Sequence, residues 1–210
     1  MKAVLISIKP KWCELIASGK KTIEVRKTRP KIDTPFKCYI YETKAIYKPS
    51  GSNHLFNGDG KVIGEFVCDC IANYEAELWD DETYERIQEF FEPDDFAEYG
   101  EYEYRTIADN GDDFWRENML CEPSCLSIEE LRKYLGVGIA TFYGWHISDL
   151  VIYDKPKGLH HFFKSCGDCT KKGTSRCTEE ITDCRAKVIT RPPQSWCYVE
   201  PHKEGVICDG

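Results

Sequence analysis

The chain has 210 residues, of which 41% are hydrophobic, so it can bury one substantial core. No stretch reaches the roughly 20 apolar residues of a membrane-spanning helix, and the apolar run at the N-terminus lacks the length and the cleavage site of a secretory signal. We therefore expect a soluble cytoplasmic protein with no membrane segment, folded as a single domain over residues 1–210.

The net charge of −8 is distributed unevenly along the chain. Residues 1–50 contain 12 Lys and Arg against 4 Asp and Glu, whereas residues 65–130 contain 3 against 22. The basic part can supply the phosphate contacts that dominate affinity for nucleic acids, with the acidic part on another face. The alternative is that both parts are ordinary solvated surface.

The first third of the sequence predicts strands joined by one short helix. Pro10 suits the first turn of that helix, and Gly19 is typical of a helix end. Apolar runs predict strands at residues 3–8, 22–27, 36–41 and 61–71, with a loop over residues 49–60.

From about residue 73 to 119 the sequence is acidic and aromatic, which predicts an insertion with weak helical character at residues 81–91. Ser127 and Glu130 then form a capping box, which predicts a helix over residues 127–134. Strands follow at 139–145, 147–153 and 195–199. Because strand and helix do not alternate regularly, we expect an α+β fold, a small mixed β-barrel with peripheral helices and the acidic insertion.

A run of charged residues from Gly19 to Arg26 is the main candidate site. Alternate residues of a strand share a face, so Glu24 and Arg26 project together, and Ile23 and Val25 face the other way. Lys21 precedes the strand. These three charged groups predict a polar pocket; the alternative is that Glu24 pairs with Lys21 or Arg26 to hold the barrel end together.

Five segments in order resemble the ASCH family of the PUA-like superfamily of small β-barrels. The segment at residues 19–26 fits the family signature of Gly, Lys, Glu and Arg. The segment at residues 191–199 resembles the closing segment of ASCH proteins common in Firmicutes and their phages. The segments are residues 5–12, 19–26, 127–134, 143–150 and 191–199.

The resemblance implies a protein that binds RNA or a nucleotide and recognises a base or modified nucleoside. Some small members are amidohydrolases that deacetylate N4-acetylcytidine, which is the alternative function. Lys21 matches their lysine, but Glu24 occupies the place of their threonine, and Ser124, two residues after Glu122, is nearest to the place of their acid. The hydrolase pattern is thus matched poorly.

Candidate ligand contacts follow from the chemistry of these side chains. Arg26 and Lys21 suit phosphate or base oxygens, Glu24 suits an exocyclic amine, and an aromatic ring can stack on a base. If the protein is an enzyme, Lys21 and Glu24 are the catalytic candidates. The predicted ligand-binding residues are Lys9, Trp12, Lys21, Glu24, Arg26 and Trp145, with Tyr143 and Trp196 as other possible stacking partners and His146 as a possible base.

The segment from residue 165 to 184 is rich in cysteine. Cys166, Cys169, Cys177 and Cys184 follow the spacing C-x2-C-x7-C-x6-C, which suits a structural zinc ion held by four thiolates. The loop between them has no apolar core, so it needs such a link to be ordered. Unliganded thiols, a redox pair and an iron–sulfur cluster are the alternatives.

Overall fold

The structure, a computed structural model, describes residues 3–48, 55–78, 85–91, 103–109, 120–164 and 188–200. Contacts divide the chain into two compact units. The first contains residues 1–17, 35–67 and 149–210, and the second contains residues 18–34 and 68–148. A single domain over the whole chain stays a prediction.

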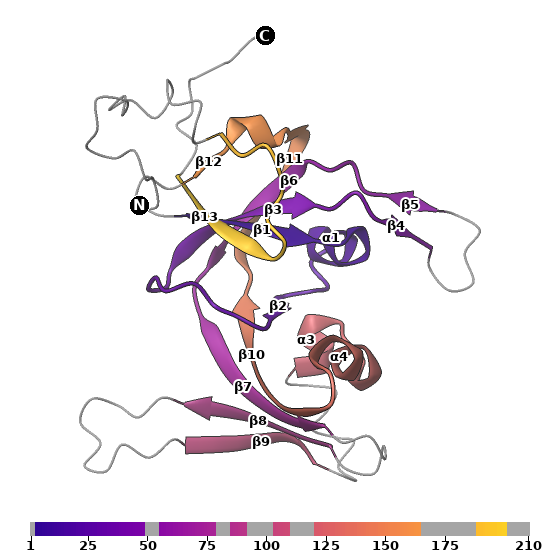
Figure 1. Ribbon diagram of the computed structural model, residues 1–210, viewed down its shortest axis with the longest axis vertical. Helices are drawn as coiled ribbons and strands as arrows, with labels where there is room; N and C mark the ends of the chain where they lie inside the picture. The colour runs from indigo at the N-terminus through magenta and orange to yellow at the C-terminus, as the bar shows by residue number, and fades with distance from the viewer. Residues whose placement is uncertain are drawn as a thin grey trace. The chain divides into compact units, whose positions relative to one another are not determined.

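The first unit contains a mixed six-stranded sheet with the strand order β11-β6-β3-β1-β13-β12 (Figure 1). The central strand β1 pairs in parallel with β3 and antiparallel with β13. The sheet strands are β1 (Ala3–Ile8), β3 (Phe36–Glu42), β6 (Val62–Cys68), β11 (Ser148–Lys157), β12 (Phe163–Lys164) and β13 (Trp196–Glu200). The other elements are helix α1 (Pro10–Ala17), the ribbon of β4 (Ile46–Tyr47) and β5 (Phe56–Asn57), and the 3-10 turn η2 (Leu159–His161).

Strand β1 lies at the centre of the first core, because all six of its residues are buried. Leu5 packs in a cluster with Tyr39 and Phe162, whose rings meet edge to face at 5.0 Å. The predicted strand at 3–8 and the helix starting at Pro10 are thus confirmed, as is the strand starting at Phe36. A strand buried on both faces has no polar alternation, which is why its sequence is a continuous apolar run.

The second unit contains a five-stranded antiparallel sheet with the order β2-β10-β7-β8-β9 (Figure 1). One face of this sheet packs against helix α4 through Val25, Tyr74, Leu131, Leu135 and Phe142. The elements are β2 (Ile23–Arg26), β7 (Ile71–Leu78), β8 (Glu85–Phe91), β9 (Glu103–Asp109), β10 (Gly138–His146), α3 (Glu122–Ser124) and α4 (Ile128–Leu135).

The predicted closed barrel is wrong. The six-stranded sheet ends at β11 and β12 and the other ends at β2 and β9, and no pairing among the described residues joins the two edges of either sheet. Closure needs a continuous hydrogen-bonded register around all the strands. The edge strand β12 has two residues and β2 has four, so each offers few backbone groups for it. What stands is a fold made mostly of sheet, with a few helices.

The helical character predicted at residues 81–91 is also wrong, because residues 85–91 form strand β8 between β7 and β9. Cross-strand contacts override the local preference: Ile87 is buried in the core, and Arg86 pairs with Glu77 on β7 at 2.6 Å. The predicted single strand at 61–71 is divided into β6 and β7 around Asp69. Within the predicted insertion, residues 73–78, 85–91 and 103–109 are strands of the sheet, and the rest lies outside the described residues.

The predicted helix after Ser127 is confirmed together with its cap. The Ser127 hydroxyl accepts a hydrogen bond from the Glu130 backbone N–H at 3.1 Å, and the Glu130 carboxylate accepts one from the Ser127 N–H at 3.2 Å. The helix ends before Gly136, whose φ of +91° favours glycine. This capping fixes α4, which covers the core face of β2 and β10.

Replacing Ser127 with Ala removes the acceptor for one of the first N–H groups of α4. We expect the free energy of unfolding to fall by about 1 kcal/mol, measured by urea denaturation followed by circular dichroism. Ser127→Asp, which restores an acceptor, should stay close to the wild type. Equal losses in both variants would show that the cap does not support the helix.

Candidate functional site

Strand β2 presents a charged face and an apolar face, as its sequence predicts. Val25 is buried in the core of the second unit, and Ile23 packs against the same cluster. Glu24 and Arg26 lie on the other face, where they form an ion pair. The alternation of side chains along four residues therefore separates the core from the candidate site.

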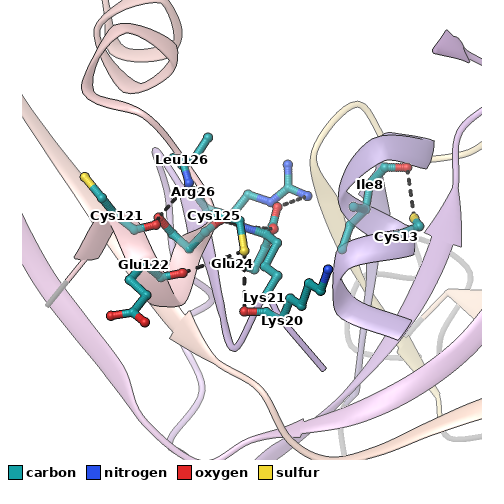
Figure 2. Close-up of polar contacts among 11 residues, drawn as sticks. Ile8, Cys13, Lys20, Lys21, Glu24, Arg26, Cys121, Glu122, Cys125 and Leu126 are labelled. Atoms are coloured by element: carbon teal, nitrogen blue, oxygen red, sulfur yellow. Dashed lines mark hydrogen bonds and ion pairs between the residues drawn. The ribbon is translucent and has the colours of Figure 1, made fainter. Parts of the chain in front are cut away.

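Glu24 joins two cations (Figure 2). Its Oε1 lies 2.9 Å from Nη2 of Arg26, and its Oε2 lies 3.3 Å from Nζ of Lys21. The exposed fractions of the side chains are 2% for Lys21, 7% for Glu24 and 11% for Arg26. We call these three residues the charged triad; it carries a formal charge of +1 in nearly buried surroundings.

Helix α3 holds the start of β2 in place. Lys21 Nζ donates to the backbone carbonyl of Ser124 at 2.6 Å. The Thr22 N–H donates to the carbonyl of Pro123 at 2.8 Å. The Cys125 thiol contacts the carbonyl of Lys20 at 3.4 Å (Figure 2). The ammonium group of Lys21 is thus held between the carboxylate of Glu24 and the carbonyl of Ser124.

The burial of the triad makes its pairing necessary. Removing charged groups from water costs several kcal/mol for each ion, and the cost is recovered only when each charge has partners. Glu24 supplies a carboxylate partner to both cations, so it is the residue that links them. In a buried setting such a cluster also acts strongly on any charge or dipole brought beside it.

Strand β10 adds two aromatic side chains to the charged face. Tyr143 is the register partner of Arg26, and Trp145 is that of Glu24. Residues directly opposite each other in an antiparallel pair share a face. Tyr143 is half-buried, whereas Trp145 is fully buried, so Trp145 offers no ring to solvent.

Arg29 and Asn73 extend this face beyond Arg26. The Cζ of Arg29 lies 5.7 Å from the Tyr143 ring centre, and its Nη1 donates to Asn73 Oδ1 at 3.4 Å. Asn73 is the register partner of Tyr143 on β7. Sequence reasoning missed Arg29 and Asn73, because only the strand register brings them beside Tyr143. We call Arg26, Arg29, Asn73 and Tyr143 the polar platform.

Lys9 and Trp12 belong to the first unit, whereas the triad belongs to the second. Lys9 is exposed, and its carbonyl accepts the N–H groups of Trp12 and Cys13 at the start of α1. Trp12 is partly buried, and Lys11 Nζ lies 4.1 Å from its ring centre. Trp196 is partly buried on β13, where it meets Tyr198 edge to face.

His146 lies at the end of β10 with an acidic partner. Its Nδ1 is 2.6 Å from Oδ1 of Asp69, and both side chains are about half exposed. The hydrogen bond with His146 holds the pKa of Asp69 below its usual value. The carboxylate of Asp69 thus orients the ring of His146. In the pairing of β10 with β2, His146 lies opposite Ile23, whereas Tyr143 lies opposite Arg26.

The four cysteines of the predicted zinc site, Cys166, Cys169, Cys177 and Cys184, lie outside the described residues. Within the described ranges, no group of three or more His, Cys, Asp and Glu side chains is placed to hold a metal ion. In the same part of the chain, no helix has the length and apolarity required to cross a membrane.

Comparison with known proteins gives one family match and several structures of similar fold. Residues 6–109 match the ASCH domain family. Among solved structures, the chain is similar to ASCH from Zymomonas mobilis, with a TM-score of 0.50 and 17% identity over 94% of this chain and 87% of that one. A mutant of the Zymomonas mobilis protein gives a TM-score of 0.49 and 17% identity over 96% and 93%.

No curated protein matches the sequence. At 17% identity, the likeness to the first structure concerns the fold alone. Kinship with the ASCH proteins of Firmicutes and their phages stays a prediction.

Replacing Glu24 with Gln tests the dependence of the triad on its one anion. The substitution leaves Lys21 and Arg26 as adjacent buried cations, so we expect the free energy of unfolding to fall by about 3–5 kcal/mol. Urea denaturation measures it. The matched control is Glu77→Gln, which removes the partner of Arg86 in the same sheet, where the side chains are 21% and 34% exposed; there the loss should stay below about 1 kcal/mol. Similar losses in both variants would contradict a special role for Glu24.

Proposed function

Because residues 6–109 contain an ASCH domain, we propose that this chain binds RNA or a nucleotide and recognises a base or modified nucleoside beside Lys21, Glu24 and Arg26. The family is linked to RNA binding. The observation that carries the proposal is the charged triad, whose excess positive charge lies beside a half-buried tyrosine.

The triad favours a ligand rich in hydrogen-bond acceptors. Its formal charge of +1 attracts an anion or an electron-rich base edge. Arg26 is its most exposed member, so a ligand reaches the guanidinium first. The planar fork of Arg donors matches a pair of acceptors on a base or a phosphate.

Glu24 adds a way to recognise an amino group. Each carboxylate oxygen has two lone pairs, so it can accept another hydrogen bond while it pairs with Lys21 or Arg26. A carboxylate accepts from the exocyclic amine of cytosine. A donor fork next to an acceptor is therefore suited to a base that presents both kinds of group.

The polar platform supplies a surface on which a base can stack. Tyr143 is half-buried, and Arg29 is exposed near its ring. Stacking on an aromatic ring contributes about 1–3 kcal/mol per base and tolerates any base, because every base has a π face. We therefore propose Tyr143, rather than the buried Trp145, as the stacking residue.

The hydrolase alternative has partial support. The structure brings Lys21 to Ser124, the residue nearest to the place of the hydrolase acid, but Ser124 contributes a backbone carbonyl and Glu122 is exposed. Lys21 Nζ already donates to that carbonyl and pairs with Glu24, so both contacts hold it in place. Binding without turnover is therefore the function that the geometry supports best.

The test of base recognition measures binding of a short single-stranded RNA by fluorescence anisotropy. Tyr143→Ala should weaken binding by about 5- to 100-fold, the equivalent of one lost stack, while Tyr143→Phe keeps the ring and should bind like the wild type. Arg26→Met should weaken binding by about tenfold and reduce the salt dependence.

Lys20→Met is the matched control for charge, because Lys20 is exposed and adjacent to Lys21 but is not part of the triad. It should change binding much less than Arg26→Met. Equal effects of the two charge variants would indicate non-specific attraction and contradict the proposed site. Circular dichroism establishes that each variant is folded.

The same protein is incubated with N4-acetylcytidine, and release of acetate is measured. We expect no turnover. Turnover that disappears in Lys21→Met, with the fold intact, would replace the binding function by the hydrolase.

We also propose that Cys166, Cys169, Cys177 and Cys184 hold a structural zinc ion. The support is their spacing, since four thiolates within 19 residues fit tetrahedral zinc. Purified protein should contain about one zinc per chain, measured by mass spectrometry of the metal, and Cys169→Ser should lose it. Cys70→Ser is the control, because Cys70 is exposed and distant in sequence; a metal content unaffected by Cys169→Ser would refute the site.

A further inference from the structure

The first unit contains a cavity that is separate from the triad. Its volume is about 410 Å³, within the range of small-molecule sites. It is formed at the carboxyl ends of β1 and β3, by the start of η2, and by residues 190–194. All of these segments belong to the first unit and are described by the structure.

Thr43 is the first sign that the cavity is a binding site. It lines the cavity, and its Oγ1 is buried with no hydrogen-bond partner among the residues that the structure describes. Its backbone is fixed, because its N–H donates to the carbonyl of Ile8 at 2.9 Å and its carbonyl accepts the N–H of Ala45 at 2.8 Å. Buried hydroxyls nearly always have a partner, so this one requires an explanation.

Lys44 supplies the charge of the cavity. Among the lining residues, all of them in the described part of the chain, it is the one that is formally charged. Its stem lies against Gly60, where a Cβ would overlap the Lys44 side chain. Gly60 has a φ of +68°, so a glycine is favoured at this position for two reasons. The backbone of Gly60 therefore makes room for the lysine at the cavity.

The remaining polar groups are mainly donors. Burial raises the pKa of the Tyr41 phenol above its usual value of 10.0, so the phenol stays protonated and can donate. Gln194 and Thr190 add an amide and a hydroxyl. Ser7 is an exception, because its hydroxyl already donates to the carbonyl of Pro193 at 2.7 Å. The cavity therefore offers one cation and several neutral hydrogen-bond donors. This number of donors is more than the two oxygens of a carboxylate need, and it suits the three terminal oxygens of a phosphate.

Three of the lining residues are apolar. Leu159, Pro192 and Pro193 offer no side-chain donors or acceptors. Such side chains suit the uncharged body of a ligand, while the polar groups fix its orientation.

We propose that this cavity is a second ligand site, which binds a small organic phosphate with its phosphate group at Lys44 and Thr43 and its uncharged body against Leu159 and the two prolines. The site is independent of the triad. A nucleoside monophosphate has both parts of such a ligand and serves as the probe.

The experiment titrates the full-length protein with cytidine 5′-monophosphate and follows backbone amide signals by NMR. The amides of Thr43, Lys44, Thr190 and Gln194 should shift, and their shifts give the dissociation constant for this cavity. Cytidine, which lacks the anion, and inorganic phosphate, which lacks the body, should each bind at least tenfold more weakly.

Lys44→Met keeps the stem and removes the charge, so the dissociation constant should rise by about 10- to 100-fold, as for a lost charged hydrogen bond. Lys44→Arg should restore most of the affinity, and Thr43→Val should weaken binding while keeping the shape. The control is Lys61→Met, because Lys61 is an exposed lysine of the same unit that does not line the cavity.

Three results would overturn the site or its ligand class. Unchanged affinity in Lys44→Met, or an absence of shifts at these amides, would overturn the site; equal affinity for benzoate would overturn the choice of phosphate. Arg26→Met separates this proposal from the proposed function. This substitution should leave the ligand-induced amide shifts at Thr43 and Lys44 unchanged. Amide shifts at Arg26 and Tyr143 of the wild type report instead on binding at the triad.

Discussion

The charged face of the second unit is organised around one carboxylate. Glu24 pairs with Lys21 and Arg26, and all three side chains are almost withdrawn from water. Three such charges can be buried together only because each has a partner, and Glu24 is the partner that the two cations share. The cluster retains one positive charge in excess, and that charge is the basis of the proposed ligand site.

The two faces of the sheet around the triad differ in polarity: one is apolar and forms the core, and the other carries the charged residues. Val25, Tyr74 and Phe142 build the core on one face, with the rings of Tyr74 and Phe142 stacked at 5.1 Å. Glu24, Arg26 and Tyr143 occupy the other face, because side chains alternate along β2 and β10 and the register aligns them. The rigidity of the core face thus positions the polar face. A site built on strands in this way is held more precisely than one built on loops.

The two candidate sites represent two different chemical designs. The triad is a charged cluster with little exposed area and an aromatic neighbour on the next strand. The lining of the cavity in the first unit has a single cation, a buried hydroxyl at Thr43 and three apolar residues. The first suits the edge and face of a base, and the second suits a compact anion with an uncharged body. If both proposals hold, this chain has more than one way to contact the parts of a nucleotide.

The sequence by itself determined the features that depend on neighbours along the chain. The apolar run of β1, the start of α1 at Pro10, the capping box at Ser127 and the two faces of β2 all follow from short-range patterns, and the structure contains them. The grouping of Glu24 and Arg26 belongs here as well, since period-two alternation is enough to predict it.

Only the tertiary structure decided features that join distant residues. Residues 85–91 became a strand because β7 and β9 pair with them, and the sheets stayed open because no described strand pairs their two edges, one of which is short in each sheet. Lys21 meets the carbonyl of Ser124 across 103 positions, and neither Trp145's burial nor the lining of the cavity leaves a local signal. Pairing and burial depend on the free energy of the whole fold, whereas caps and periodicity depend on a few adjacent residues.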